Sequence, residues 1–167
     1  MSESSELADK VRAVHRRYPT GVTIVSVADE DGAPGGLAVN AFSSVSLEPP
    51  LILVAINATS STYPKLFGAD HIAVNVVAES QEAVVQTFAK SGPDKFANIA
   101  WHPGVTGAPL IDGASGYFEL AVRYRIPAYT HTIFIGEVIA ASFTDEPALI
   151  YVDGSFHPGS VILGNAD

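Results

Sequence analysis

Residues 22–57 read VTIVSVADEDGAPGGLAVNAFSSVSLEPPLILVAIN, and this stretch decides the fold class. Its first segment, 22–27, is rich in β-branched residues, which favour strands. The Asp31-Gly32 dipeptide is a turn signal, and the apolar residues behind it predict a return strand over 37–40. The segment therefore begins with a β-hairpin.

A second hairpin follows directly. Strand character resumes over 43–47, and the Glu-Pro-Pro sequence at 48–50 interrupts it, because proline cannot donate to a strand ladder. Residues 51–57 are almost continuously apolar, which predicts a strand buried on both faces.

The rest of the chain adds three helices and further strands. Helices are predicted over 6–17 with Ser4 or Ser5 as N-cap and Tyr18-Pro19 as its end, over a short segment from 62 to Gly68, and over 80–90 with Ser80 as N-cap and Val84, Val85 and Phe88 buried. Strands are predicted over 72–77, 117–126, 133–141 and 149–152.

These patterns predict a mainly β fold with a few helices. Strands and long helices do not alternate regularly, which argues against a doubly wound parallel sheet. About seven strands with two hairpins favour a closed or partly closed barrel. No repeat or linker divides the sequence, so we expect a single domain over 1–167, with its core over about 10–158 and flexible tails at 1–5 and 160–167.

Composition excludes several function classes. The formal net charge of -9 repels nucleic acid and anionic lipid, so any phosphate-bearing ligand needs local donors. The absence of cysteine excludes thiolate metal sites and cysteine nucleophiles, and the scattered histidines predict no metal site. No signal peptide or membrane-spanning apolar run is visible, and we expect a cytoplasmic protein.

No catalytic or nucleotide-binding signature of the Rossmann, P-loop or nucleophile-elbow type is present. Three clusters of small hydroxyl residues stand out instead, at 20–23, 40–46 and 59–62. A helix N-terminus preceded by hydroxyls binds anions readily. Each cluster taken alone is also an ordinary set of caps and turn residues.

Five motifs in a fixed order make the sequence similar to the flavin reductase-like family. They are Tyr18-Pro-Thr-Gly-Val-Thr23, Asn40-Ala-Phe-Ser-Ser-Val-Ser-Leu-Glu-Pro-Pro50, Ser61-Thr-Tyr-Pro64, Asp94-Lys-Phe96 with Trp101, and His131-Thr-Ile-Phe-Ile-Gly-Glu-Val138. The resemblance covers roughly residues 15–156. It implies a homodimer of FMN-binding split β-barrels with Greek-key-like connections, in which each flavin lies near the subunit interface.

The resemblance also implies roles for individual residues. Thr20, Gly21, Val22 and Thr23 would face the edge of the isoalloxazine ring, and Asn40, Ala41, Phe42, Ser43 and Ser44 would follow the ribityl chain. Ser61 and Thr62 would contact the phosphate, Lys95 and Phe96 would close over the flavin tail, and His131 would lie where the nicotinamide stacks. From the residues alone, Phe42 and Phe96 are better described as core aromatics, and Trp101 is interpreted as a packing residue. His131 also fits a hydrogen-bonded residue at a strand end, and Lys95 fits an exposed surface.

The sequence departs from the family pattern at three positions. Thr130 precedes the histidine where an acidic residue is frequent, Asp153 stands where a cation is common, and Leu120 replaces a frequent cysteine. Thr130 and Asp153 bear on nicotinamide binding more than on flavin binding.

The function implied by the resemblance is an NAD(P)H-dependent flavin reductase. It would pass a hydride from NADH or NADPH to FMN or FAD and supply reduced flavin to a separate monooxygenase. One alternative is a protein that holds flavin tightly for storage, sensing or electron transfer without nicotinamide turnover. Another is a split-barrel enzyme whose flavin acts on a small substrate of its own.

Overall fold

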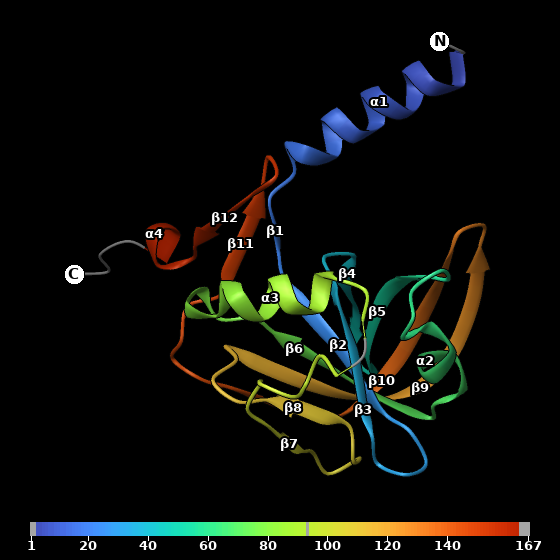
Figure 1. Cartoon of the computed structure of the whole chain (residues 1–167), viewed down its shortest axis with the longest axis vertical. Coiled ribbons are helices and arrows are strands. Elements are labelled where there is room, and N and C mark those ends of the chain that lie inside the picture. Colours follow the sequence, from blue (N-terminus) through green and yellow to red (C-terminus); the bar gives the residue numbers. More distant parts are fainter. Residues whose placement is uncertain (1–2, 93, 164–167) are drawn as a thin grey trace.

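The computed structural model describes residues 3–92 and 94–163. Its helices are α1 (Glu3–Arg16), α2 (Tyr63–Gly68), η1 (Glu79–Gln81), α3 (Glu82–Ala89) and α4 (Ser160–Leu163). Its strands are β1 (Thr20–Gly21), β2 (Thr23–Ala28), β3 (Pro34–Val39), β4 (Phe42–Leu47), β5 (Pro50–Asn57), β6 (His71–Val76), β7 (Trp101–Pro103), β8 (Pro109–Ile111), β9 (Gly116–Ala128), β10 (His131–Phe143), β11 (Leu149–Val152) and β12 (Ser155–Pro158) (Figure 1).

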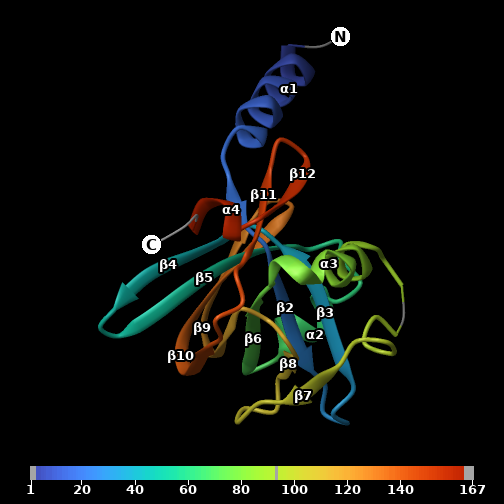
Figure 2. The ribbon, with the colours of Figure 1, turned by 90° about the vertical axis from the view of Figure 1, so that its left-hand side faces the viewer.

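A seven-stranded antiparallel sheet forms the body of the protein, in the order β3-β2-β6-β9-β10-β5-β4. The two edge strands, β3 and β4, are consecutive in sequence and are joined only by residues 40 and 41. That link spans at most about 11 Å, whereas seven strands laid flat are roughly 29 Å wide. The sheet must therefore curl until the linked ends of β3 and β4 meet, and Figure 2 shows the two strands diverging from there.

The core lies on both faces of the curled sheet. The cluster inside the curl contains the buried residues Val25, Val27, Leu37, Val39, Ile52, Val54, Ile56, Leu66, Ile72, Val74, Leu120 and Phe134. A second cluster lies under α3 and contains Val22, Ile24, Val77, Val85, Phe88, Phe96, Ile111 and Leu149. The strand predictions over 22–27, 43–47, 72–77 and 149–152 agree with these elements to within a residue or two.

Two details of the helix predictions are wrong. The 80–90 segment begins as the 3-10 turn η1 and becomes α-helical only at Glu82, so Ser80 lies inside the turn and Gln81 takes the cap position. Helix α1 is already formed at Glu3, so Ser4 and Ser5 lie within it. Val85 and Phe88 are buried as predicted, whereas Val84 is only half-buried.

The prediction that 51–57 is buried on both faces is also wrong. In β5 the side chains of Ile52, Val54 and Ile56 are buried, while the alternating residues Leu51 and Leu53 are half-exposed. The physical reason is that one face of β5 lines the interior of the curl, whereas no layer formed by residues 3–92 and 94–163 covers the other face.

Helix α1 projects away from the body of the protein (Figure 1). The helical spacing of Leu7, Val11 and Val14 is confirmed, but these side chains are 64%, 48% and 66% exposed. Their apolar face therefore has no packing partner among the described residues. Residues 3–5 belong to α1 and 160–163 form α4, and the remainder of the two predicted tails, 1–2 and 164–167, lies outside the described residues. None of the described helices has the length and apolar character needed to cross a membrane.

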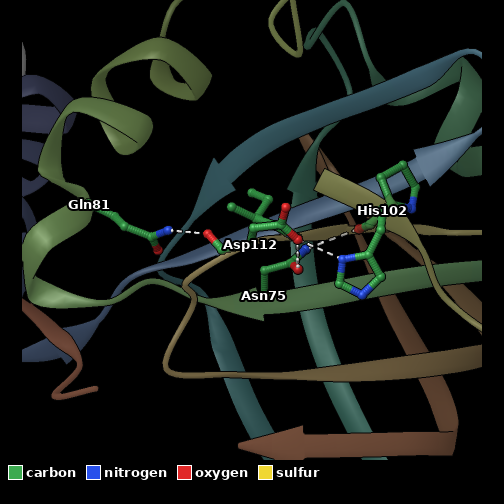
Figure 3. A network of polar contacts seen from close by, with 6 residues as sticks. Asn75, Gln81, His102 and Asp112 are labelled. Atoms are coloured by element: carbon green, nitrogen blue, oxygen red, sulfur yellow. Dashed lines mark hydrogen bonds and ion pairs between the residues drawn. The ribbon is translucent and has the colours of Figure 1, made fainter. Parts of the chain in front are cut away.

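The β7–β8 hairpin was not predicted, and buried polar side chains attach it to the sheet. Asn75 of β6 is fully buried, and its amide donates to the carbonyl oxygens of Ile24 and Pro109 and accepts from the Ile111 N–H at 2.9 Å. Nearby, the Gln81 amide donates to the Asp112 carbonyl, and His102 Nδ1 lies 2.6 Å from the Asp112 carboxylate (Figure 3). Such short strands carry too few residues for a sequence pattern.

A buried carboxylate holds the tip of the same hairpin. Glu119 of β9 is almost fully buried, and both of its oxygens accept hydrogen bonds from the turn between β7 and β8. The donors are the Val105 N–H at 3.1 Å and the Thr106 N–H at 2.7 Å, together with the Thr106 hydroxyl. These charge-assisted bonds compensate the desolvation of the carboxylate.

We expect Asn75→Ala to lower the free energy of unfolding by about 3 kcal/mol, because it leaves the buried Ile111 N–H without its side-chain partner and removes the bonds to the Ile24 and Pro109 carbonyls. The exposed pair of His102 and Asp112 provides a matched control in the same network. His102→Ala should lower the free energy of unfolding by less than about 1 kcal/mol. Urea denaturation of both variants measures the difference. Equal losses would show that the buried amide does not anchor the hairpin.

Candidate functional site

Two cavities lie at opposite ends of β3, and they collect most of the predicted site residues. The first has a volume of about 630 Å³ and lies beyond the C-terminal end of β3. It is lined by His15, Tyr18, Pro19, Thr20, Gly21, Val22, Thr23, Asn40, Ala41, Phe42, Leu53 and Val76. The structure thus brings the predicted segments 20–23 and 40–42 together.

The second cavity has a volume of about 750 Å³ and lies at the N-terminal end of β3. Its walls include the four predicted residues Ser61, Thr62, Lys95 and Phe96, together with Pro34, Gly35, Gly36, Lys65, Gly92, Asp94 and Trp101. Gly36 of this cavity and Asn40 of the first are separated by roughly 13 Å of extended strand. We call the two spaces the Asn40 cavity and the Lys95 cavity.

Hydroxyl groups in the Asn40 cavity differ in their hydrogen bonding. Thr23 is buried, and its hydroxyl donates to the Val39 carbonyl at 2.7 Å, which ties β2 to the end of β3. The Thr20 hydroxyl oxygen is buried and has no hydrogen-bond partner in the described part of the chain. A buried polar atom without a partner is costly, so Thr20 has an unused polar group at the cavity wall.

Strand β4 contributes less to the site than predicted. Phe42 is half-buried and stacks on Phe118 with a centroid distance of 5.9 Å, so it is a core aromatic that also reaches the Asn40 cavity. Ser43 and Ser44 are exposed on β4 and line neither of the two cavities.

The two predicted phosphate hydroxyls have different surroundings. Thr62 is buried, and its hydroxyl donates to the Gly36 carbonyl at 3.0 Å, which joins the segment before α2 to β3. Ser61 is exposed at the rim of the Lys95 cavity, and its hydroxyl forms no hydrogen bond within the described residues. Thr62 therefore has a structural role already, and Ser61 is the freer donor.

Lys95 is half-buried in the wall of its cavity rather than on the surface. Its ammonium donates to the carbonyl oxygens of Gly36 and Phe88, each at 3.2 Å. Phe88 lies in the last turn of α3, where a cation stabilises the free carbonyl groups. Across residues 3–92 and 94–163, no carboxylate forms an ion pair with Lys95, and burial lowers the pKa of its ammonium.

A second lysine, which the sequence analysis missed, lines the same cavity. Lys65 on α2 lies 2.8 Å from the Asp29 carboxylate, and its hydrogen bond is the main reason why the pKa of Asp29 is lowered. Gly35 lies beside it, since a Cβ there would come within 3.3 Å of Lys65 Cδ. Only the fold brings residues 29, 35 and 65 together.

His131 lies at the start of β10, at the same end of the sheet as the Asn40 cavity. It pairs with Asn57 of β5, while the Ala55 N–H bonds to the Ala41 carbonyl. Ideal strand spacings then place His131 roughly 12 Å from Ala41. The histidine is exposed, and its Nδ1 lies 2.9 Å from the Thr130 hydroxyl.

Comparison with known proteins identifies this arrangement. The sequence model of the "Flavin reductase like domain" matches residues 15–160. The chain belongs to the flavin reductase-like domain family. A solved flavin reductase-like structure, the NADH:FAD oxidoreductase of Streptomyces globisporus in complex with NAD and FAD fragments, superposes with a TM-score of 0.85. It is 35% identical, and the match covers 90% of this chain and 91% of that chain.

Curated relatives in this family point the same way. The reductase component of the flavin-dependent trigonelline monooxygenase of Acinetobacter baylyi is 37% identical over 88% of this chain, and a flavin reductase of Pseudomonas putida is 34% identical over 87%. The chain spans about half of the Acinetobacter relative, 47% of its length, and 86% of the Pseudomonas relative.

The Ser61 and Thr62 hydroxyls should have different effects, one on flavin affinity and the other on stability. We expect Ser61→Ala to weaken flavin affinity about fivefold, the worth of one hydrogen bond, without changing stability. Thr62→Val should lower the free energy of unfolding by about 1 kcal/mol, because it removes the bond to Gly36. Flavin titration and urea denaturation of both variants measure the two effects. Unchanged flavin affinity in Ser61→Ala would remove this residue from the phosphate site.

Proposed function

We propose that the protein is an NAD(P)H-dependent flavin reductase. It transfers a hydride from a reduced nicotinamide to FMN or FAD and supplies reduced flavin to a separate monooxygenase. The observation that carries the proposal is the pair of cavities at the two ends of β3. Gly36 and Asn40, which line one cavity each, are roughly 13 Å apart along the strand, a spacing that suits a ligand with a flat ring system at one end and a phosphate at the other.

The residues of both cavities fit a flavin. In the Asn40 cavity, Thr20 offers a buried hydroxyl that has no partner among the described residues. The exposed Gly21 and Asn40 leave backbone and amide groups accessible to the polar edge of the ring. In the Lys95 cavity, the Ser61 hydroxyl and the Lys95 ammonium have no hydroxyl or carboxylate partner in the part of the chain that the structure describes, so both can reach a ligand. A protein with a net charge of -9 requires such local donors to hold a phosphate.

The chemistry needs little from the protein beyond alignment. A bound flavin accepts a hydride directly from a nicotinamide, so no protein nucleophile is required. The strand ends at Thr20 and Asn40 would fix the ring, and His131 would orient the nicotinamide from the edge of the sheet. Holding two rings at reacting distance and excluding water is the contribution of this chain.

We infer further that the protein has the FMN-binding split-barrel fold and that it is active as a homodimer. The curled sheet has edge strands that are joined but not paired, which supports a barrel that is split. The half-exposed face of β5 and the exposed apolar face of α1 support a second subunit as their cover.

The experiment that tests the proposal is nicotinamide oxidation followed at 340 nm, with FMN, FAD or no flavin added. We expect turnover that increases with added flavin and saturates. Stoichiometric flavin binding without turnover of NADH or NADPH would contradict the proposal. That result would favour a protein that holds flavin without nicotinamide turnover.

We predict that His131→Ala lowers kcat/KM for the nicotinamide about tenfold and changes flavin affinity less than twofold, because the proposed role of the residue is to orient the nicotinamide and not to hold the flavin phosphate. The control is His71→Ala, an exposed histidine at the start of β6. Steady-state kinetics with saturating flavin measure the effect. A parallel loss of flavin affinity would assign His131 a structural role.

A further inference from the structure

A third cavity lies between helix α1 and the turn that joins β11 to β12. Its volume is about 370 Å³, and it is lined by Asp9, Arg12, Ala13, Arg16, Arg17 and Asp153. The Asp153 N–H donates to the Arg16 carbonyl at 2.7 Å, which holds the turn against the end of α1 (Figure 1). We call this space the arginine cavity.

The arginine cavity contains two cations that are free to bind an anion. Arg12 and Asp9 neutralise each other, since their side chains lie 2.6 Å apart. Arg16 and Arg17 are exposed, and neither forms an ion pair within residues 3–92 and 94–163. A guanidinium group binds phosphate oxygens through paired N–H donors. In a protein with a net charge of -9, two adjacent unpaired arginines attract a phosphate-bearing ligand to this place.

Asp153 restricts which phosphate-bearing ligand fits the arginine cavity. Its carboxylate is exposed and forms no ion pair with any residue that the structure describes. A carboxylate beside a diphosphate site accepts hydrogen bonds from ribose hydroxyls and repels a further phosphate on the same ribose. Asp153 is also one of the three departures from the family pattern. The donor and acceptor groups together suit a diphosphate joined to an unphosphorylated ribose.

The arginine cavity lies next to the Asn40 cavity. Thr20, in the wall of the Asn40 cavity, pairs with Tyr151 of β11, and Asp153 lies two residues further along the chain. Ideal strand spacings place the Cα atoms of Asp153 and Thr20 roughly 8 Å apart. His15 lines the Asn40 cavity, and Arg16 directly follows it. A dinucleotide with its nicotinamide in the Asn40 cavity can therefore reach the arginine cavity with its diphosphate.

Helix α1 presents the cavity residues on the side opposite its apolar face. At 3.6 residues per turn, the centre of Asp9, Arg12, Ala13 and Arg16 lies roughly 180° around the helix from the centre of that face. A second subunit that packs on the apolar face therefore need not cover the arginine cavity.

We propose that the arginine cavity binds the adenosine diphosphate half of NADH and makes the protein selective for NADH over NADPH. Arg16 and Arg17 contact the diphosphate, while Asp153 accepts hydrogen bonds from the adenosine ribose and repels the 2′-phosphate of NADPH. The inference rests on the proposed function, since it places the nicotinamide over a flavin in the Asn40 cavity. FAD carries the same adenosine diphosphate group, so FMN serves as the flavin where the two sources must be separated.

Steady-state kinetics with saturating FMN measure the selectivity. We expect kcat/KM to be at least about tenfold higher for NADH than for NADPH, and Asp153→Asn to reduce this ratio about tenfold. Asparagine tolerates the left-handed backbone of residue 153, where φ is 52°. The control is Asp145→Asn, which removes an exposed carboxylate outside the cavity. No preference for NADH in the wild type, or an unchanged ratio in Asp153→Asn, would overturn the proposal.

The arginines are tested in the same assay. Arg16→Gln and Arg17→Gln should each raise KM for NADH about fivefold, keep kcat and FMN affinity within about twofold, and weaken the dependence of KM on ionic strength. Lys10→Gln is the matched control, because it removes one positive charge from α1 outside the cavity. If Arg17→Gln instead weakens FAD binding and leaves KM for NADH unchanged with FMN, the cavity belongs to FAD and the proposal is wrong.

A binding measurement needs neither a variant nor turnover. Adenosine diphosphate ribose should bind the wild-type protein in a calorimetric titration, compete with NADH and leave FMN affinity unchanged. Its 2′-phosphorylated form should bind at least about tenfold more weakly. Absence of binding, equal affinities of the two ligands, or displacement of FMN would each contradict the proposal.

Failure of the proposed function is distinguishable from failure of this inference. Binding of adenosine diphosphate ribose that Arg17→Gln weakens, without nicotinamide oxidation, would contradict the reductase and support the nucleotide site. Equal turnover of NADH and NADPH would contradict only this inference.

Discussion

The two-residue link between β3 and β4 is the constraint on which the structure depends. These strands form opposite edges of a seven-stranded sheet, yet only residues 40 and 41 connect them. The sheet must curl to satisfy this connection. The curl encloses the main core, and it brings the start of β2 beside the link itself, which creates the Asn40 cavity. The fold and the candidate site therefore have the same geometric origin.

The Lys95 cavity depends on parts attached to the outside of that sheet. Asn75 and Glu119 lie on strands of the sheet and accept hydrogen bonds from backbone N–H groups of the β7–β8 hairpin. This hairpin begins at Trp101. Lys95 connects the end of α3 to Gly36 of β3, and Thr62 bonds to the same carbonyl. Buried polar bonds thus position the walls of a cavity that is open to a ligand. Because the protein has a net charge of -9, a phosphate in this cavity depends on local cations, and Lys95 is the lysine there that forms no ion pair within the described residues.

Much of the candidate site could be predicted because its segments are contiguous in sequence. The segments 20–23 and 40–42 converge, and so do Ser61, Thr62, Lys95 and Phe96. Ser43 and Ser44 were included in the predicted site through the family resemblance. Both are exposed on the edge strand β4 and line neither cavity. Lys65 and its partner Asp29 gave no sequence signal, since the two residues meet only after β2, β3 and α2 are packed.

By itself, the sequence determined which segments become strands and helices. β-branched runs, turn dipeptides and helical spacing are local signals, and they located β2, β4, β6, β11 and α1. Only the tertiary structure decided the strand order, the one-sided burial of β5, the short β7–β8 hairpin and the composition of the two cavities. Those features rest on contacts between residues far apart in the chain, such as Asn75 with Ile111 and Thr62 with Gly36. A local pattern encodes how a segment folds, whereas the partner that covers it is fixed by packing of the whole chain.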